Sequence, residues 1–306
     1  MKVITWLWSQ PGGRATYHPW HVRVWAAMIR RHLTLDHTLA VVTNLEGDYG
    51  SDVEVIKPPG EFEDVRIPTW KEARPQCLRR LSMFRRDADS LFGAERLVCT
   101  DLDLVVCRSL DPVLGIKDDF KIARGTHRTR AYNGSLMSLK LGSRPKVYEE
   151  FTPEAAIQAG RLHVGSDQSW IAHCLPGEKT WAPEDGVCFW MASQRFDLAR
   201  VLFFAGETKP WSLAGVGENK FITEHYRAER GDHCLLLGHS PGLWTDVYKA
   251  LSENSFDGVI ASPEAAAHWP GKVLAIADDD EHAERLAYLH GFDRVTWCGK
   301  SEGSQA

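Results

Sequence analysis

The sequence predicts an α/β fold with a mostly parallel β-sheet in a larger first domain and a compact α/β unit after it. Short apolar segments, typical of buried strands, alternate with segments whose apolar residues recur at helical spacing. After a weakly patterned, charged stretch at residues 212–232, the same alternation begins again. We therefore expect one domain over residues 1–215 and a second over residues 216–306.

The first domain begins with a predicted buried strand at residues 3–8 (VITWLW), followed by a loop that contains Pro11-Gly12-Gly13. Residues 21–33 carry apolar side chains on one helical face and arginines on the other, which predicts a helix. Residues 76–87 predict a second, Arg-rich amphipathic helix whose arginines face solvent. The remaining strands of this domain are expected at residues 39–43, 53–56, 96–100, 101–106, 120–123, 135–139 and 201–204.

The second domain repeats the pattern on a smaller scale. Its helices are expected from residue 245, over residues 264–269 and over residues 281–290, and residues 301–306 form a polar tail. The strands between them are predicted at residues 234–237, 258–261, 272–277 and 294–297. The role of this unit is not indicated by any motif.

Composition narrows the function classes. A chain of 306 residues is long enough to bury a large core, and its net charge of −5 gives no general attraction to nucleic acid or anionic lipid. The seven cysteines form no C-x-x-C pair and are expected to be reduced. No apolar run reaches the length of a signal or membrane-spanning segment, so we expect a cytoplasmic protein without a membrane span.

Two carboxylates follow the most apolar strand, in the sequence Leu97-Val98-Cys99-Thr100-Asp101-Leu102-Asp103. In extended backbone, residues i and i+2 point the same way, so Asp101 and Asp103 can reach one hard cation. Open α/β sheets bind ligands at the carboxyl ends of their strands. A Mg²⁺ or Mn²⁺ ion held there would neutralise a departing diphosphate.

Further motifs follow this pair in a set order: Tyr132-Asn133-Gly134-Ser135, then Gly165-Ser166-Asp167-Gln168-Ser169-Trp170, then Gly206-Glu207-Thr208-Lys209-Pro210-Trp211. Together with the D-x-D strand, they resemble glycosyltransferase family 8 and related bacterial and phage transferases. The resemblance covers about residues 1–215. It implies the Rossmann-like GT-A fold and transfer of a hexose-type sugar from a nucleotide-sugar donor, with UDP as the expected nucleotide.

The resemblance also implies roles for individual residues. Asp101 and Asp103 would contact the metal, Mn²⁺ or Mg²⁺, and the donor's diphosphate and ribose. Asp167, beside the transferred sugar, is the implied catalytic residue. The other implied donor contacts are Trp8 and Tyr17 at the base, Arg80, Asn133 at the sugar, Gly206, Lys209 at the diphosphate, and Trp211.

One family feature is missing. Relatives carry a metal-ligating His in the strand before the Lys-Pro-Trp motif, whereas residues 201–206 (VLFFAG) contain none, which leaves the metal requirement open. The resemblance implies retention of anomeric configuration, either by a front-face route or by double displacement through Asp167. The acceptor stays open among a glycan, a lipid, a protein and a modified DNA base, and the oligomeric state is not indicated.

Two further functional classes compete with this interpretation. The chain is alternatively a GT-A binding or scaffold protein that has lost catalysis, or a haloacid-dehalogenase-like phosphatase, whose nucleophile motif Asp101-Leu102-Asp103 resembles and whose later acidic pair would come from Asp278-Asp279-Asp280. An esterase with Ser240 in Gly238-His239-Ser240-Pro241-Gly242 is disfavoured, because Pro241 lacks the N–H that would donate to the oxyanion.

The candidate residues also have purely structural interpretations. Asp167 is suited to cap the helix that follows it, Asn133-Gly134 is a strong turn dipeptide, and Trp8 is suited to a core position.

Overall fold

The computed structural model describes residues 1–9, 17–68, 76–190, 196–213, 220–226, 233–237, 259–260 and 272–276. The chain forms two compact units, one from residues 1–18 and 32–207 and the other from residues 19–31 and 208–306. The second unit thus includes residues 19–31 and 208–215, in addition to the stretch after residue 215 that the sequence assigns to it.

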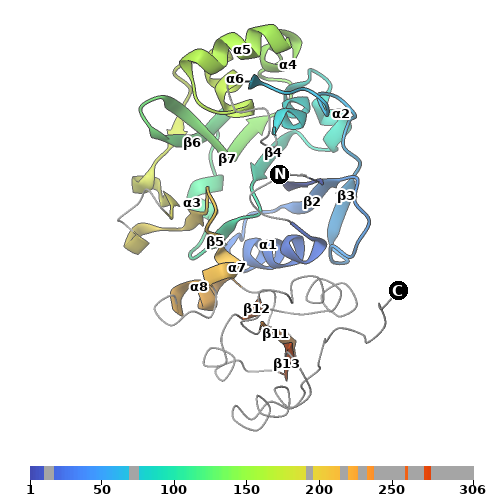
Figure 1. Cartoon of the computed structure of the whole chain (residues 1–306), viewed down its shortest axis with the longest axis vertical. Coiled ribbons are helices and arrows are strands. Elements are labelled where there is room, and N and C mark those ends of the chain that lie inside the picture. Colours follow the sequence, from blue (N-terminus) through green and yellow to red (C-terminus); the bar gives the residue numbers. More distant parts are fainter. Residues whose placement is uncertain are drawn as a thin grey trace, which may run out of the picture. The chain divides into compact units, whose positions relative to one another are not determined.

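The first unit is built on a seven-stranded sheet in the order β3-β2-β1-β4-β7-β6-β8 (Figure 1). In this sheet β7 pairs with its neighbours β4 and β6 in the antiparallel sense, and every other pairing is parallel. All its strands except β7 therefore run in the same direction. The strands are β1 (Lys2–Leu7), β2 (Thr38–Thr43), β3 (Val53–Ile56), β4 (Arg96–Thr100), β6 (Phe120–His127), β7 (Arg130–Lys140) and β8 (Thr180–Trp181). The predicted α/β fold with a mostly parallel sheet is confirmed.

One face of this sheet packs on helical segments that follow β3 and β7 in the chain. Alternate residues of the central strands, such as Ile4, Trp6, Leu97 and Cys99, share one buried cluster with apolar residues of these segments. The segments are η2 (Leu78–Phe84), α2 (Ala88–Phe92), α4 (Lys146–Glu149), α5 (Pro153–Leu162) and α6 (Asp167–Cys174). The core therefore lies between the sheet and these segments.

A second, three-stranded sheet completes this unit, in the order β5-β10-β9. β10 (Val201–Phe203) runs antiparallel to β5 (Leu104–Val106) and parallel to β9 (Val187–Phe189). Between these strands lie α3 (Asp111–Leu114), η3 (Pro183–Asp185) and η4 (Phe196–Leu198). The small sheet matters for the site because β5 begins directly after Asp103.

The second unit contains nearly all of α1 (Pro19–His32), with α7 (Pro210–Leu213), α8 (Lys220–His225) and three parallel strands. These strands, β11 (His233–Leu237), β12 (Val259–Ile260) and β13 (Lys272–Ile276), have the order β12-β11-β13 and match three of the four predicted for this unit. The fourth strand and the helices predicted after residue 245 lie outside the described residues. Within the described residues no helix combines the length and the apolar character needed to span a bilayer.

Two local predictions are wrong. The amphipathic helix expected at residues 76–87 is instead the 3-10 segment η2, and all seven of its residues are buried, including Arg79 and Arg80. Arg80 pairs with the half-buried Asp101 and the buried Asp167, whereas Arg79 pairs with Glu63, which is exposed. The strand expected at residues 101–106 is interrupted, because the chain bends at residues 102–103 and only Leu104–Val106 forms a strand, in the other sheet.

Candidate functional site

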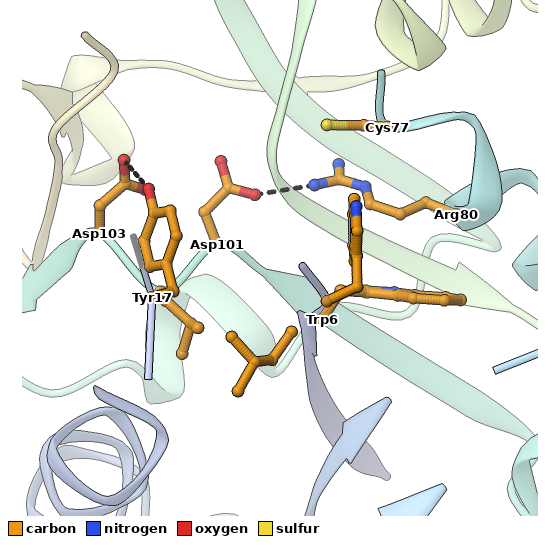
Figure 2. A pocket seen from close by; sticks show the side chains of 9 residues that line it. Trp6, Tyr17, Cys77, Arg80, Asp101 and Asp103 are labelled. Atoms are coloured by element: carbon orange, nitrogen blue, oxygen red, sulfur yellow. Dashed lines mark hydrogen bonds and ion pairs between the residues drawn. The ribbon is translucent and has the colours of Figure 1, made fainter. Parts of the chain in front are cut away.

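A cavity of about 140 Å³ lies at the carboxyl ends of β1 and β4 (Figure 2). These strands are parallel neighbours, but the chain leaves β1 toward β2 and β3 on one side and returns to β4 on the other. Open α/β sheets bind ligands at such a reversal of strand order. The cavity is lined by Trp6, Leu7, Trp8, Tyr17, Cys77, Arg80, Asp101, Leu102 and Asp103.

The two carboxylates of the D-x-D motif both line this cavity, but they have different partners. Asp101 is held within the protein: its Oδ1 accepts from Arg80 Nη1 at 2.7 Å and its Oδ2 accepts from the Ser135 hydroxyl at 2.6 Å. Asp103 Oδ2 accepts from the Tyr17 hydroxyl at 3.1 Å (Figure 2). The bend at residues 102–103 therefore replaces the extended geometry that the sequence predicts, while both side chains still reach one cavity.

Arg80 is the centre of the charged network. Besides Asp101, its guanidinium contacts the backbone oxygen of Gly134 through Nη2 and lies 3.0 Å from Asp167 Oδ2 through Nε. Burial alone would lower the pKa of Arg80, but Asp167 and Asp101 raise it well above its ordinary value. The guanidinium is therefore a permanent buried cation that joins η2 to the residue after β4, to the interior of β7 and to the first residue of α6.

A bulge in β7 supplies two of these contacts. Ile122 of β6 pairs with Met137, whereas the next residue, Ala123, pairs with Asn133, so three residues of β7 have no partner on β6. Such a bulge re-aims the backbone and side chains beside it. Here it presents the Gly134 carbonyl to Arg80 and the Ser135 hydroxyl to Asp101.

Asn133 stabilises the bulge from within. Its Oδ1 accepts from the Ser135 backbone N–H at 2.9 Å, and the residue is 4% exposed. The dipeptide Asn133-Gly134 thus lies inside a strand rather than in the turn that its composition favours. The predicted contact between Asn133 and a donor sugar stays a prediction.

Asp167 is the first residue of α6, directly after the N-cap position Ser166. It is 4% exposed, and burial raises its pKa although the nearby Arg80 opposes this shift. Its carboxylate therefore acts as a buried charge on Arg80 rather than as the helix cap. Asp167 reaches the cavity only through Arg80, since it is not among the lining residues.

Aromatic side chains form the opposite side of the cavity. Burial, followed by the nearby Asp103, raises the pKa of Tyr17 well above its ordinary value, so its hydroxyl stays protonated and donates to that carboxylate. Trp8 is half-buried, packs edge-on against Trp6 with ring centroids 6.0 Å apart, and lies under the guanidinium of Arg79 at 5.8 Å. Trp8 and Tyr17 thus both line the cavity, where the sequence places a base.

The net negative charge of the site suits a bound divalent cation. The described residues that line the cavity or pair with Arg80 include three carboxylates, Asp101, Asp103 and Asp167, and one guanidinium, which gives a formal charge of two negative units. Oxygen ligands of this kind suit Mg²⁺ or Mn²⁺, and Mg²⁺ is often held by one or two carboxylates together with substrate phosphates. The described residues contain no group of three His, Cys, Asp or Glu side chains suited to a metal. The donor set therefore fits an ion whose coordination a bound phosphate completes.

The remaining predicted residues lie further along the chain. Gly206 adopts φ 150° in the loop after β10, a conformation that favours glycine. Lys209 and Trp211 belong to the second unit, and Lys209 is buried. The ring centroid of Trp211 lies 4.3 Å from that of His21 and 6.2 Å from that of Tyr226. Their donor contacts stay predictions. Residues 238–242 and 278–280, which carry the esterase and phosphatase alternatives, lie outside the described residues.

Several residues of the site had no predicted role. Ser135 and Gln168 occur in the recognised motifs, and Gln168 Oε1 accepts from the Gly134 N–H at 3.1 Å. Trp6 also lines the cavity; its position two residues before Trp8 in a strand is the sequence signal that places both side chains on one face. No signal points to Cys77, because it lies within the segment at residues 76–87 that the sequence assigns to an amphipathic helix.

Comparison with known proteins gives structural likeness only. No family model matches the sequence, and no curated protein sequence is similar to it. The galactosyltransferase LgtC in complex with donor and acceptor sugar analogues matches with a TM-score of 0.47 and 12% identity, over 73% of this chain and 94% of that one.

Two other solved structures match over different lengths. The glycosyltransferase GlyE of Streptococcus pneumoniae TIGR4 matches with a TM-score of 0.47 and 11% identity, over 98% of this chain and 81% of that one. Mouse xyloside xylosyltransferase 1 matches with a TM-score of 0.40 and 13% identity, over 68% of this chain and 99% of that one. All three are glycosyltransferases, the class that the sequence motifs resemble.

Proposed function

We propose that this chain is a glycosyltransferase that moves a hexose-type sugar from a nucleotide-sugar donor, with UDP as the expected nucleotide. The observation that carries the proposal is the cavity at the reversal of strand order, where Asp101 and Asp103 meet Arg80 and the aromatic rings of Trp8 and Tyr17. Carboxylates for a cation, a fixed positive charge and flat rings are the groups that a nucleoside diphosphate requires.

Different lining residues suit the base and the diphosphate of such a donor. The rings of Trp8 and Tyr17 would stack with the base, while Asp101 and Asp103 would hold Mg²⁺ or Mn²⁺ beside the diphosphate. The ion, when bound, would neutralise the departing phosphate. The cavity is smaller than the ~300–1,000 Å³ of most ligand pockets, so it takes part of the donor only. Residues 10–16 and 69–75, which border it in sequence, lie outside the described residues.

The geometry favours a positioning role for Asp167. A nucleophile for double displacement needs an accessible carboxylate oxygen, but Asp167 is 4% exposed and its Oδ2 lies against Arg80 Nε. We infer that Asp167 orients the guanidinium of Arg80, which in turn faces the cavity. This arrangement supports the front-face route for a retaining transfer, in which the positive sugar carbon is stabilised by the departing diphosphate.

The phosphatase alternative rests on two acidic motifs, of which the structure describes one. Asp101 and Asp103 line the cavity, whereas the later acids at residues 278–280 lie outside the described residues. A binding protein without catalysis would share the same cavity, so turnover separates it from a transferase.

The proposal is tested by calorimetric titration of the whole chain with UDP, GDP and CMP, each with Mn²⁺, Mg²⁺ or EDTA. We expect one nucleotide to bind in a metal-dependent manner, and Asp103→Asn to weaken this binding by about ten-fold or more. The control is Asp118→Asn, because Asp118 lies outside the cavity lining and pairs with the exposed Lys179.

Absence of nucleotide binding under every condition would overturn the proposal, as would equal binding by the Asp103→Asn variant. Release of nucleotide from the matching sugar donor then distinguishes a transferase from a binding protein.

A further inference from the structure

A basic and apolar surface patch lies beside the site, made of Arg124, Arg128, Arg161, Leu162 and Val164 (the hairpin patch). Leu162 is 68% exposed and Val164 is 39% exposed. The only other exposed large apolar side chains among the described residues are Val55, at 55%, and Phe221, at 37%. Two of these four side chains thus lie within three positions of each other, at the end of α5 and in the loop after it, where exposed apolar area is concentrated.

The charged side chains of the two chain segments that carry the patch are all positive. No Asp or Glu occurs at residues 120–148 or 155–166. Arg124, Arg128 and Arg161 are exposed, and none of them forms an ion pair with any residue of the described part of the chain. In contrast, the exposed Arg86 pairs with Glu149. The patch is therefore a local excess of positive charge on a chain whose net charge is −5.

The two segments that carry the patch are joined. Arg124 and Arg128 belong to the hairpin of β6 and β7, while Arg161, Leu162 and Val164 belong to the end of α5 and the loop before α6 (Figure 1). The Val164 backbone N–H donates to the Thr129 carbonyl at 3.0 Å, which places the loop against the tip of the hairpin. The hairpin tip that carries Arg128 and the loop that carries Val164 therefore lie side by side.

We propose that the hairpin patch docks this protein onto a lipid bilayer that contains anionic headgroups. Exposed apolar side chains beside cations are the combination by which proteins bind such an interface, since the apolar groups enter the headgroup boundary and the cations meet lipid phosphates. A nucleic acid would use the arginines but would leave Leu162 and Val164 in water. The proposal goes beyond the proposed function and does not depend on it.

The patch is also connected to the cavity. Gln168 Nε2 donates to the Val164 carbonyl at 3.2 Å, and its Oε1 accepts from the Gly134 N–H at 3.1 Å. Gly134 in turn contacts Arg80 through its carbonyl. The two hydrogen bonds of the Gln168 side chain would thus link a bilayer in contact with Val164 to the β7 bulge that positions Arg80.

The test is co-sedimentation of the whole chain, without nucleotide, with vesicles of pure phosphatidylcholine and with vesicles of equimolar phosphatidylcholine and phosphatidylglycerol. We expect binding to the anionic vesicles only, weakened by added salt because surface charges are screened. The double variant Arg128→Gln/Arg161→Gln should lower the partition coefficient by about five-fold for each arginine. The matched control is Arg108→Gln, an exposed arginine outside the patch.

The apolar contribution is tested separately with Leu162→Ser/Val164→Ser, and with Val55→Ser as control. We expect the double variant to bind vesicles more weakly than the control while its binding to a DNA duplex stays unchanged. Failure of the native chain to bind anionic vesicles would overturn the proposal. It would also be overturned if the serine variant bound them as the native chain does, since the patch would then be a general polyanion surface.

Because all these positions are exposed, circular dichroism should confirm that each variant retains the fold. Nucleotide titration is measured independently of vesicle binding, so a failed vesicle experiment leaves the proposed function standing.

Discussion

Arg80 carries a charge that the fold can bury only because its partners are buried with it. Its side chain is about 6% exposed and lies between Asp101 and Asp167. Burial of an isolated ion is costly, and removing one member of a buried pair leaves the other uncompensated. The residue is therefore structural and functional at once: it completes the core beneath the cavity and gives the cavity its fixed positive charge.

Replacing this arginine should cost more stability than replacing an exposed one. We expect Arg80→Met to lower the free energy of unfolding by about 3–5 kcal/mol, because Asp167 would keep a buried charge without a cation. Arg86→Met removes an ion pair whose arginine is 72% exposed and should cost about 1 kcal/mol or less. Urea unfolding followed by circular dichroism compares the two, and equal losses would contradict a buried network.

The sequence predicts Arg80 at the site, but not how it is held. Its match to a family position near the donor identifies the residue, whereas the pattern of arginines at residues 76–87 indicates a solvated helical face. Arg80 is buried because Asp167 and the Gly134 carbonyl, both distant in sequence, contact its guanidinium. No local pattern contains this information.

At the scale of an element, the β7 bulge determines where the network can form. A Cβ placed on Gly134 would lie 2.5 Å from Arg80 Nη2 and 3.3 Å from Asp167 Oδ2. The glycine is therefore required by close approach of the guanidinium. A regular strand at this point would direct the Ser135 hydroxyl and the Gly134 carbonyl elsewhere.

Gly134→Ala should accordingly displace Arg80. We expect a loss of about 1–3 kcal/mol in the free energy of unfolding, typical of overpacking, together with weaker nucleotide binding. Gly60→Ala is the control, because no atom lies within 4 Å of the position of its added Cβ. Thermal unfolding and nucleotide titration of both variants provide the measurement, and an unchanged Gly134→Ala protein would mean that the guanidinium does not need this space.

The sequence predicted the central strands β1 and β4 but not the 3-10 segment η2, because the strands are recognisable from their own residues and η2 is not. The first strand, at Lys2–Leu7, and the fourth, at Arg96–Thr100, are buried along nearly their whole length and are mostly apolar, so composition alone finds them. The η2 segment is buried in spite of its arginines, and the ion pairs that permit this come from other elements.

At the scale of the whole molecule, buried thiols couple stability to alkaline pH. Burial raises the pKa of Cys77, Cys99, Cys107 and Cys174 from an ordinary value of 9.0 to about 12. Between these values the unfolded chain has lost the thiol protons and the folded chain keeps them. Since the folded state then binds more protons, the free energy of unfolding must fall as the pH rises through this window.

Removing one of these thiols should flatten this dependence. We expect Cys99→Ala to lose less stability than the native chain between about pH 9 and pH 12, because one ionising group no longer contributes. Ser138→Ala, which removes a buried hydroxyl from β7, should leave the slope unchanged. Urea unfolding at several pH values gives the slopes, and parallel slopes for Cys99→Ala and the native chain would show that Cys99 ionises normally in the fold.

The strand order of the sheet is the part of the whole-molecule design that no sequence pattern specified. Alternating strands and helices predict a mostly parallel sheet, but the reversal between β1 and β4, which creates the cavity, follows from how the strands pair. The sequence therefore predicts which residues are candidates, and the topology determines which of them meet.

The position of Arg80 in the chain has a consequence for biosynthesis. During translation Arg80 leaves the ribosome before any of its partners: Asp101 follows 21 residues later, Gly134 follows 54 residues later, and Asp167 later still. Until α6 has emerged, the nascent chain holds a guanidinium that it cannot bury, so the sheet cannot close around it. The first unit should thus complete its folding only after residue 167 has been synthesised, and a ribosome stalled before that point would present an open, protease-sensitive chain.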